Sequence, residues 1–206
     1  DIAVDFHGRV HKSMAKVLAH ELEPYKLMFM EEVVLPENEE GFREVANQVS
    51  TPLATGERLV SRWQYKNLFR EGAIDIIQPD VALVGGILET KKLGDLAQTY
   101  GVRMALHQAA TPIHAMAAAH IGVATENCWA CEFHANDVPW WDDLIISRMR
   151  KPLIQNGFIE VPDLPGLGID DMNDEVIAEH ISQLNPGVWE PTDEWNHEYS
   201  VDAIYN

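Results

Sequence analysis

Acidic side chains recur at a regular interval in the first third of the chain, each at the end of a short apolar run. Asp5 ends IAVD, Glu31 ends KLMFME and Glu57 ends TPLATGE, so the interval is 26 residues twice. Carboxylate oxygens are the ligands that Mg²⁺ prefers, and three of them leave open positions for a substrate. Without a cation the charges would repel one another, and some carboxylates would hold protons. The spacing predicts a magnesium site, in preference to three separate solvated residues.

Two histidines follow the same pattern of positions. His107 ends the run VRMALH and Asp80 ends the preceding run IDIIQPD, so the carboxylate would hold the imidazole in one tautomer and raise its basicity. His7, two residues after Asp5, would face the same centre from the other side. We therefore predict a general base in His107 with Asp80, and a general acid in His7. A structural role is expected for the lone histidines His11, His20, His180 and His197.

A divalent cation with a base on one face and an acid on the other suits removal of a proton beside a carboxylate. The cation stabilises the resulting enediolate. If a hydroxyl sits on the next carbon, His7 can protonate it as it leaves as water, and the net reaction is dehydration. A racemase would instead use the two groups as opposed bases.

Short apolar runs with polar ends recur along the chain, and an amphipathic helical stretch follows nearly every one. The runs are IAVDF, KLMFMEE, TPLATGE, IDIIQPD, VRMALHQ and CWACEF. Their polar ends lie at positions 5, 31, 57, 80, 107 and 132, at intervals of 26, 26, 23, 27 and 25 residues. One strand and one helix per repeat is typical of parallel β/α architecture, in which eight units close into a barrel.

Four helices are expected between these runs, and their apolar residues at i, i+3 and i+4 would cover the outside of a barrel. Their sequences are MAKVLAHELEPY, GFREVANQV, SRWQYKNLFREG and LETKKLGDLAQTYG. A doubly wound open sheet is the main alternative, but FHGRVHK after the first run does not match the phosphate-binding pattern G-x-G-x-x-G. The pattern favours a TIM-like barrel with six of its units in this chain.

The repeat stops near residue 136, and prolines divide the remainder into short pieces. The stretch NDEVIAEHISQL begins with an asparagine at a cap position and has helical spacing, so one more helix is expected there. We divide the chain into a partial barrel that carries catalysis, residues 1–135, and a C-terminal tail, residues 136–206, that wraps the barrel.

The net charge and the apolar runs of the chain limit the kinds of partner that it can bind. The chain has 206 residues and a net charge of −18, so its field repels phosphate backbones and nucleic acid is not expected as a partner. A carboxylate substrate would need a locally positive site, which a bound cation supplies. No apolar run approaches the ~20 residues of a membrane helix, and the first residues show no secretory signal. We expect a soluble cytoplasmic protein that acts on a small molecule.

The two cysteines, Cys128 and Cys131, give no disulfide framework, which favours a reducing compartment. Their spacing also fits a thioredoxin-type redox motif. That motif belongs at a helix N-terminus, whereas CWAC lies in an apolar run that reads as a strand. We expect both to be small core residues.

At these residues the sequence resembles the enolase superfamily, in its mandelate racemase branch, and within that branch the acid-sugar dehydratases of the D-galactonate dehydratase type. The resemblance is carried by DFHGRVHKSMAKVLAHELEPYKLMFMEE, GERLVSRW, DIIQPD and the turn that contains two glycines. It implies a (β/α)7β barrel capped by an α+β domain that the N-terminus and the C-terminal tail build. We expect these 206 residues to hold barrel strands three to eight and the tail, without the N-terminal capping domain.

The resemblance also implies roles for individual residues. Arg9 and Arg58 fall in matching motifs and are interpreted only as supports, and His134 is left without a role. The implied roles are magnesium ligation for Asp5, Glu31 and Glu57, the base dyad for His107 with Asp80, proton donation for His7, and hydrogen bonding near the carboxylate or enediolate for Glu132.

Three stretches depart from the family pattern. MEEVV stands where the family commonly has EEP, HQAATP replaces HCPLGP after the base, and CEFHANDVPWW differs from the galactonate type. The last two loops line the substrate site in the family, so the sugar acid stays open.

The leading hypothesis is dehydration of an aldonate to a 2-keto-3-deoxy sugar acid, with D-galactonate first and gluconate or another sugar acid next. A racemase, epimerase or cycloisomerase of the same superfamily is the nearest alternative. A non-enzymatic barrel is a third, and the intact set of polar strand ends argues against it. By resemblance alone, a homo-oligomer is expected.

Overall fold

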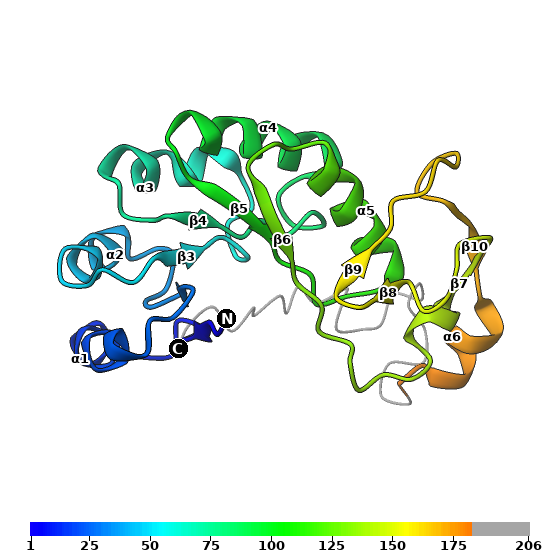
Figure 1. Ribbon diagram of the computed structural model, residues 1–206, viewed down its shortest axis with the longest axis horizontal. Coiled ribbons are helices and arrows are strands. Elements are labelled where there is room, and N and C mark those ends of the chain that lie inside the picture. The colour runs from blue at the N-terminus through cyan, green and yellow to red at the C-terminus, as the bar shows by residue number, and fades with distance from the viewer. Residues whose placement is uncertain (183–206) are drawn as a thin grey trace, which may run out of the picture.

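The computed structural model describes residues 1–182 of the chain. Its centre is a half-barrel sheet of six parallel strands, each paired with the next along the sequence (Figure 1). The strands are β1 (Val4–Asp5), β2 (Met30–Glu31), β3 (Leu53–Thr55), β4 (Ile76–Ile77), β5 (Arg103–Leu106) and β6 (Cys128–Cys131). All six predicted strands are present, although their paired parts are shorter than the apolar runs. The consecutive order excludes the doubly wound alternative, in which strand order reverses at a switch point.

Each predicted helix follows its strand, and the helices cover the outer side of the sheet (Figure 1). The predicted run SRWQYKNLFREG begins as a 3-10 turn, because the Ser61 side chain accepts a hydrogen bond from the backbone N–H of Trp63. No helix within the described part of the chain is both long and apolar enough to cross a bilayer. The helices are α1 (Lys12–Leu22), α2 (Glu39–Ala46), α3 (Lys66–Glu71), α4 (Gly86–Thr99) and α5 (Pro112–Val123), with 3-10 turns η1 (Glu23–Tyr25) and η2 (Arg62–Tyr65).

The main core lies between the sheet and these helices. Met30 and Leu53 from the strands pack there with Phe42 and Leu93 from the helices, and all four are almost fully buried. Successive residues of a strand face opposite sides, so Ala54, next to Leu53, belongs to a smaller cluster with Phe29, Ile76 and Ala105. The alternation thus gives the sheet two apolar faces, as a barrel wall requires.

Helix α5 differs from the others because it is apolar on all sides. Ala118 and Ile121 belong to the main core, whereas Ala115 and Met116 pack with Trp141 and the C-terminal region. A helix buried on both sides has no polar face, and this is why its sequence shows no amphipathic period.

The C-terminal region forms more regular structure than the single predicted helix. Strand β7 (Ile145–Ser147) pairs with β10 (Ile169–Met172), and β8 (Ile154–Gln155) pairs with β9 (Phe158–Ile159). These strands have two to four residues each, too short for a clear alternation in the sequence.

The predicted C-terminal helix is present as α6 (Asp174–His180). Its cap residue Asn173 accepts a hydrogen bond from the backbone N–H of Val176 at 3.4 Å. The end of the predicted run NDEVIAEHISQL and the predicted structural residue His197 lie outside the described residues.

Candidate active site

The polar residues at the strand ends meet at one edge of the sheet. Strand register places Asp5 beside Glu31, and an isolated parallel bridge joins Asp80 to His107. Glu57 lies two residues beyond the end of β3. In a parallel β/α barrel this carboxyl edge is where catalytic side chains gather.

The loop after β1 folds back on Asp5. The backbone N–H of His7 donates to Asp5 Oδ1 at 2.6 Å, and His7 Nδ1 lies 2.9 Å from Asp5 Oδ2. His7 has a φ of 52° and Gly8 a φ of 60°, the left-handed region that costs a non-glycine residue about 1 kcal/mol or more. The backbone N–H of Gly8 donates to the carbonyl of Glu32, which ties this strained turn to the loop after β2.

Glu57 stands between the two histidines. Its Oε1 lies 4.0 Å from His7 Nδ1, and its Oε2 lies 3.7 Å from His107 Nε2. The preceding residue, Gly56, has a φ of 149°, and its carbonyl accepts a hydrogen bond from the buried hydroxyl of Tyr65 at 2.9 Å. His7 and His107 therefore lie near different oxygens of one carboxylate.

His107 and Asp80 form a close pair. His107 Nδ1 lies 2.7 Å from Asp80 Oδ2, and Nε2 points away toward Glu132 Oε2 at 3.8 Å. Burial alone would lower the pKa of His107, but contact with Asp80 and the charges of Glu132 and Glu57 outweigh it and raise that pKa. Burial alone would raise the pKa of Asp80, but contacts with His107 and His114 hold it well below its usual range. Asp80 therefore holds Nδ1 of His107, and Nε2 is free to accept a proton.

Negative charge accumulates where the strands β1 to β3 end. Burial, together with the charges of Asp5, Glu132 and Glu57, raises the pKa of Glu31 to about 7, although hydrogen bonding with Gln78 opposes the shift. Carboxyl groups crowded in this way bind hard divalent cations. The donor set therefore fits Mg²⁺.

The atoms that lie closest together belong to a partly different set from the predicted ligands. One ligand atom each of His7, Glu32 and Glu57 lies within 4.8 Å of the others. Glu32 is fully buried, and its Oε2 lies 3.1 Å from Arg58 Nη1. Asp5 is itself in contact with His7 through both of its oxygens, so the ligand set of Asp5, Glu31 and Glu57 stays a prediction.

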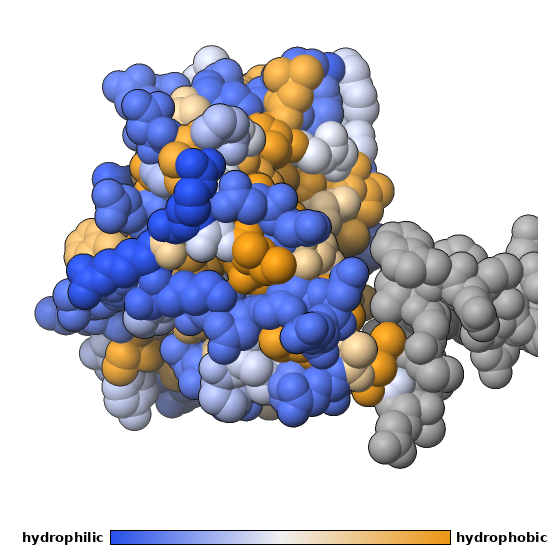
Figure 2. Space-filling view, turned by 90° about the vertical axis from the view of Figure 1, so that its right-hand side faces the viewer, coloured by the Kyte–Doolittle hydropathy of each residue, from blue (hydrophilic) through white to orange (hydrophobic). Residues whose placement is uncertain are grey.

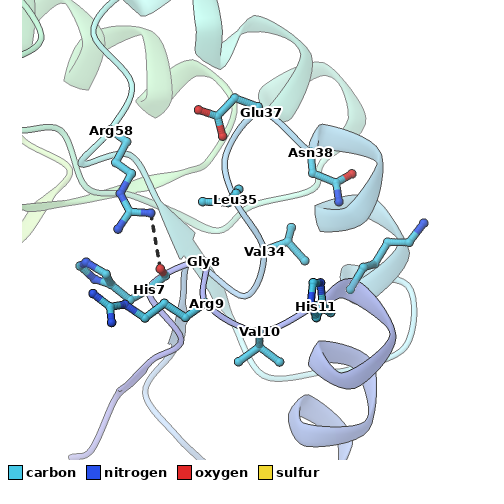
Figure 3. A pocket seen from close by; sticks show the side chains of 11 residues that line it. His7, Gly8, Arg9, Val10, His11, Val34, Leu35, Glu37, Asn38 and Arg58 are labelled. Atoms are coloured by element: carbon cyan, nitrogen blue, oxygen red, sulfur yellow. Dashed lines mark hydrogen bonds between the residues drawn. The ribbon is translucent and has the colours of Figure 1, made fainter. Parts of the chain in front are cut away.

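Two cavities flank the row of strand-end residues. One, of about 580 Å³, is lined by His7, Arg9, Lys12 and Arg58 together with Glu37 and apolar side chains. In Figure 3, Arg58 reaches down toward His7, and its Nη1 donates to the His7 carbonyl at 3.4 Å.

The other cavity, of about 620 Å³, runs from Glu132 to Trp141 and the loops of the C-terminal region. Figure 2, which faces the side where this region lies, shows hydrophobic surface between hydrophilic areas. The candidate site is therefore open to ligands on two sides.

Several contacts near the site were not predicted from the sequence, although Arg58 was interpreted as a support and Glu132 was given a role. Glu32 pairs with Arg58, the backbone N–H of Gln108 donates to Glu132 Oε2 at 3.1 Å, and His114 Nε2 lies 3.3 Å from Asp80 Oδ1. His134 Nε2, which the sequence left without a role, lies 3.5 Å from Glu132 Oε1. Glu32, Arg58 and Gln108 directly follow predicted strand ends, whereas His114 and His134 lie away from them and could not be found by that signal.

The histidines and cysteines with predicted structural roles are part of helices, turns or the core, although His11 also lines the cavity beside His7. His20 pairs with Glu23 at the end of α1, His180 stacks on Trp140 with ring centroids 4.2 Å apart, and His11 is the N-cap residue of α1. Cys128 and Cys131 are partly buried in β6 and pack against the main core. Burial raises the pKa of Cys131 to about 12, so its thiol is not a reactive thiolate.

The chain resembles known acid-sugar dehydratases. It is 40% identical over 169 residues to the D-xylonate dehydratase of Haloferax volcanii, a match that covers 82% of this chain and 40% of that protein. It is 37% identical over 201 residues to the D-galactonate dehydratase of Ralstonia nicotianae, covering 96% of this chain and 51% of that protein. This chain thus spans about half or less of the length of these curated relatives.

The fold agrees with these matches. A crystal structure of a mandelate racemase/muconate lactonizing enzyme-like protein from Rubrobacter xylanophilus superposes with a TM-score of 0.84 at 35% identity, over 89% of this chain and 46% of that one. Residues 1–175 match the model of the family described as enolase C-terminal domain-like. The chain belongs to this enolase C-terminal domain-like family and resembles the mandelate racemase branch of the enolase superfamily.

Proposed function

We propose that this chain carries the catalytic residues of a magnesium-dependent dehydratase that converts an aldonate to a 2-keto-3-deoxy sugar acid. The observation that carries the proposal is the position of Glu57 between His7 and His107, 4.0 Å from one ring and 3.7 Å from the other. A base and an acid that both reach a substrate bound at the metal are what removal of a proton and of a neighbouring hydroxyl requires.

We assign Asp5, Glu31 and Glu57 as the residues that hold Mg²⁺. The bound ion would supply positive charge to the substrate carboxylate and to the enediolate that follows. The pKa of about 7 for Glu31 supports this assignment, because a carboxyl group that resists ionisation alone becomes a good ligand once a cation offsets its neighbours.

The protein side chains then move two protons. His107 Nε2 accepts the proton from the carbon beside the carboxylate, because Asp80 occupies Nδ1 and stabilises the imidazolium. His7 gives a proton to the hydroxyl on the next carbon, the C–O bond breaks, and water leaves. The electron pair of the broken C–H bond becomes the new carbon–carbon double bond, and the enol tautomerises to the 2-keto acid. Glu132, close to His107 Nε2, hydrogen-bonds near the substrate carboxylate.

The relatives named for D-galactonate and D-xylonate support an aldonate as substrate. We place D-galactonate first, since the motif resemblance is to that type. Arg9 lines the cavity beside His7 and would attract an anionic substrate there. We further propose residues 1–135 as the catalytic unit, with residues 136–206 packing on the barrel and its capping region.

Turnover of a panel of sugar acids by the intact protein tests this function. D-galactonate, D-xylonate and D-gluconate are each incubated with Mg²⁺ or with EDTA, and the 2-keto-3-deoxy product is measured. We expect magnesium-dependent product from at least one acid. Exchange of the proton beside the carboxylate with inversion and without keto product would instead identify a racemase or epimerase. No exchange and no product with any sugar acid would contradict the proposed function.

A further inference from the structure

His114 is a buried histidine at the back of the candidate dyad. It lies in the first turn of α5, where its ring is only 7% exposed. Its Nε2 lies 3.3 Å from Asp80 Oδ1. Among residues 1–182, neither ring nitrogen of His114 has a well-aligned hydrogen bond, so this carboxylate oxygen is the polar atom that meets the ring. A buried imidazole without a polar partner costs free energy, and Asp80 Oδ1 is a carboxylate oxygen within reach of its Nε2.

The two oxygens of Asp80 are divided between different partners. Oδ1 accepts hydrogen bonds from the backbone N–H groups of Ala82 at 2.7 Å and Leu83 at 3.2 Å, and it is the oxygen that faces His114. Oδ2 faces His107 Nδ1 at 2.7 Å. The contacts of Oδ1 therefore fix the rotation of the Asp80 carboxylate, so that Oδ2 faces His107.

We propose that His114 is a positioning residue of the base dyad: it holds Asp80 so that Asp80 in turn keeps the proton of His107 on Nδ1. His114 acts through Asp80 and does not touch the substrate. The low pKa of Asp80, to which His114 contributes, supports a carboxylate that stays ionised behind the base. The part of this inference that concerns catalysis rests on the proposed function.

The test compares His114→Gln with His114→Asn in the intact protein. A glutamine amide nitrogen reaches the position of the histidine Nε2, whereas an asparagine amide nitrogen reaches only the position of Nδ1. His114→Leu removes both ring nitrogens. His120→Leu, in the last turn of the same helix, is the matched control, and circular dichroism verifies the fold of each variant.

The first readout is long-range ¹⁵N–¹H NMR of the His107 ring, which needs no substrate. We expect a protected Nδ1 proton in the native protein, in His114→Gln and in His120→Leu, and loss of that protection in His114→Asn and His114→Leu. Equal spectra for His114→Gln and His114→Asn would overturn the inference. This comparison holds even if His114→Leu does not fold. This readout separates failure of the inference from failure of the proposed function, since it is independent of turnover.

The second readout is steady-state kinetics on the acid that the panel identifies. We expect His114→Asn to lower kcat by about 10-fold to 100-fold with an unchanged KM, and His114→Gln to recover most of the loss, as for outer partners of other functional histidines. A purely structural role would instead lower the active fraction of both variants alike. Equal kcat in both variants would overturn the inference.

Discussion

His107 presents Nδ1 to Asp80 Oδ2 at 2.7 Å, so that Nε2 is the ring nitrogen on the side of Glu57 and Glu132. This relationship fixes which nitrogen can act as the base. It also makes the tautomer of His107 depend on a carboxylate that no substrate touches.

Asp80→Asn is expected to lower kcat by about 100-fold or more while KM changes little, because the amide favours the wrong tautomer of His107. The measurement is steady-state turnover with the fold verified by circular dichroism. Asp163→Asn, at an exposed position of the C-terminal region, is the control. An equal loss of kcat in Asp80→Asn and Asp163→Asn would contradict a role of Asp80 in fixing the tautomer of His107.

His7→Gln is expected to block loss of water but to leave removal of the α-proton intact. Exchange of that proton with D₂O, followed by NMR, should therefore continue while product formation falls by about 100-fold or more. A substrate with fluoride in place of the departing hydroxyl needs no acid, and it should restore elimination in the variant. If His7→Gln also stops exchange, removal of the α-proton depends on His7 as well, which contradicts its assignment as the general acid alone.

Magnesium affinity is expected to depend on pH through Glu31. The pKa of Glu31 in the metal-free protein is raised to about 7, mainly by burial, so below that pH the ion must displace a proton before it binds. Affinity should rise from pH 5 to about pH 8 and then level off, with proton release on binding largest below pH 7. Calorimetry in two buffers of different ionisation enthalpy measures both quantities.

The matched variant for this prediction is Glu31→Gln, which has no proton to displace. Its affinity for Mg²⁺ should be weaker and should vary less with pH. A native protein whose affinity is flat between pH 5 and pH 8 would remove Glu31 from the ligand set.

Gly56→Ala is expected to destabilise the protein by about 2 kcal/mol or more. Gly56 has a φ of 149°, and an added Cβ would lie 2.7 Å from the Tyr65 hydroxyl and 2.8 Å from the backbone nitrogen of Gln78. Gly72→Ala is the control, because Gly72 also has a positive φ but open space around it. Chemical denaturation of both variants measures the difference, and equal losses would mean that only backbone strain, not the close approach, matters at Gly56.

The sequence alone was enough to predict the strands, because each apolar run ends at a polar residue and the interval repeats. The same regularity identified His107 and Asp80, which the structure joins by a parallel bridge. The pairing of Glu32 with Arg58 was not predicted, although the two are 26 residues apart at successive strand ends, because the repeat gives positions and not side-chain partners. His114 was missed because a single histidine in an apolar helix looks structural until the helix is placed behind Asp80.

The C-terminal region was the least predictable part. Its strands are held by contacts such as the hydrogen bond from Trp141 Nε1 to the Ala110 carbonyl at 2.8 Å, not by local pattern. Such contacts join residues far apart in the sequence, so they leave no periodic trace.

The measurement that tests the central claim most directly is formation of the 2-keto-3-deoxy product by His107→Asn beside the native protein and His20→Asn, with saturating Mg²⁺. His20 is exposed on α1 and lies outside the candidate site, so its variant should match the native rate. We predict no detectable product and no exchange of the α-proton with His107→Asn, in a protein that still folds and binds Mg²⁺. Product formation by this variant at a rate near the native one would contradict the assignment of His107 as the base.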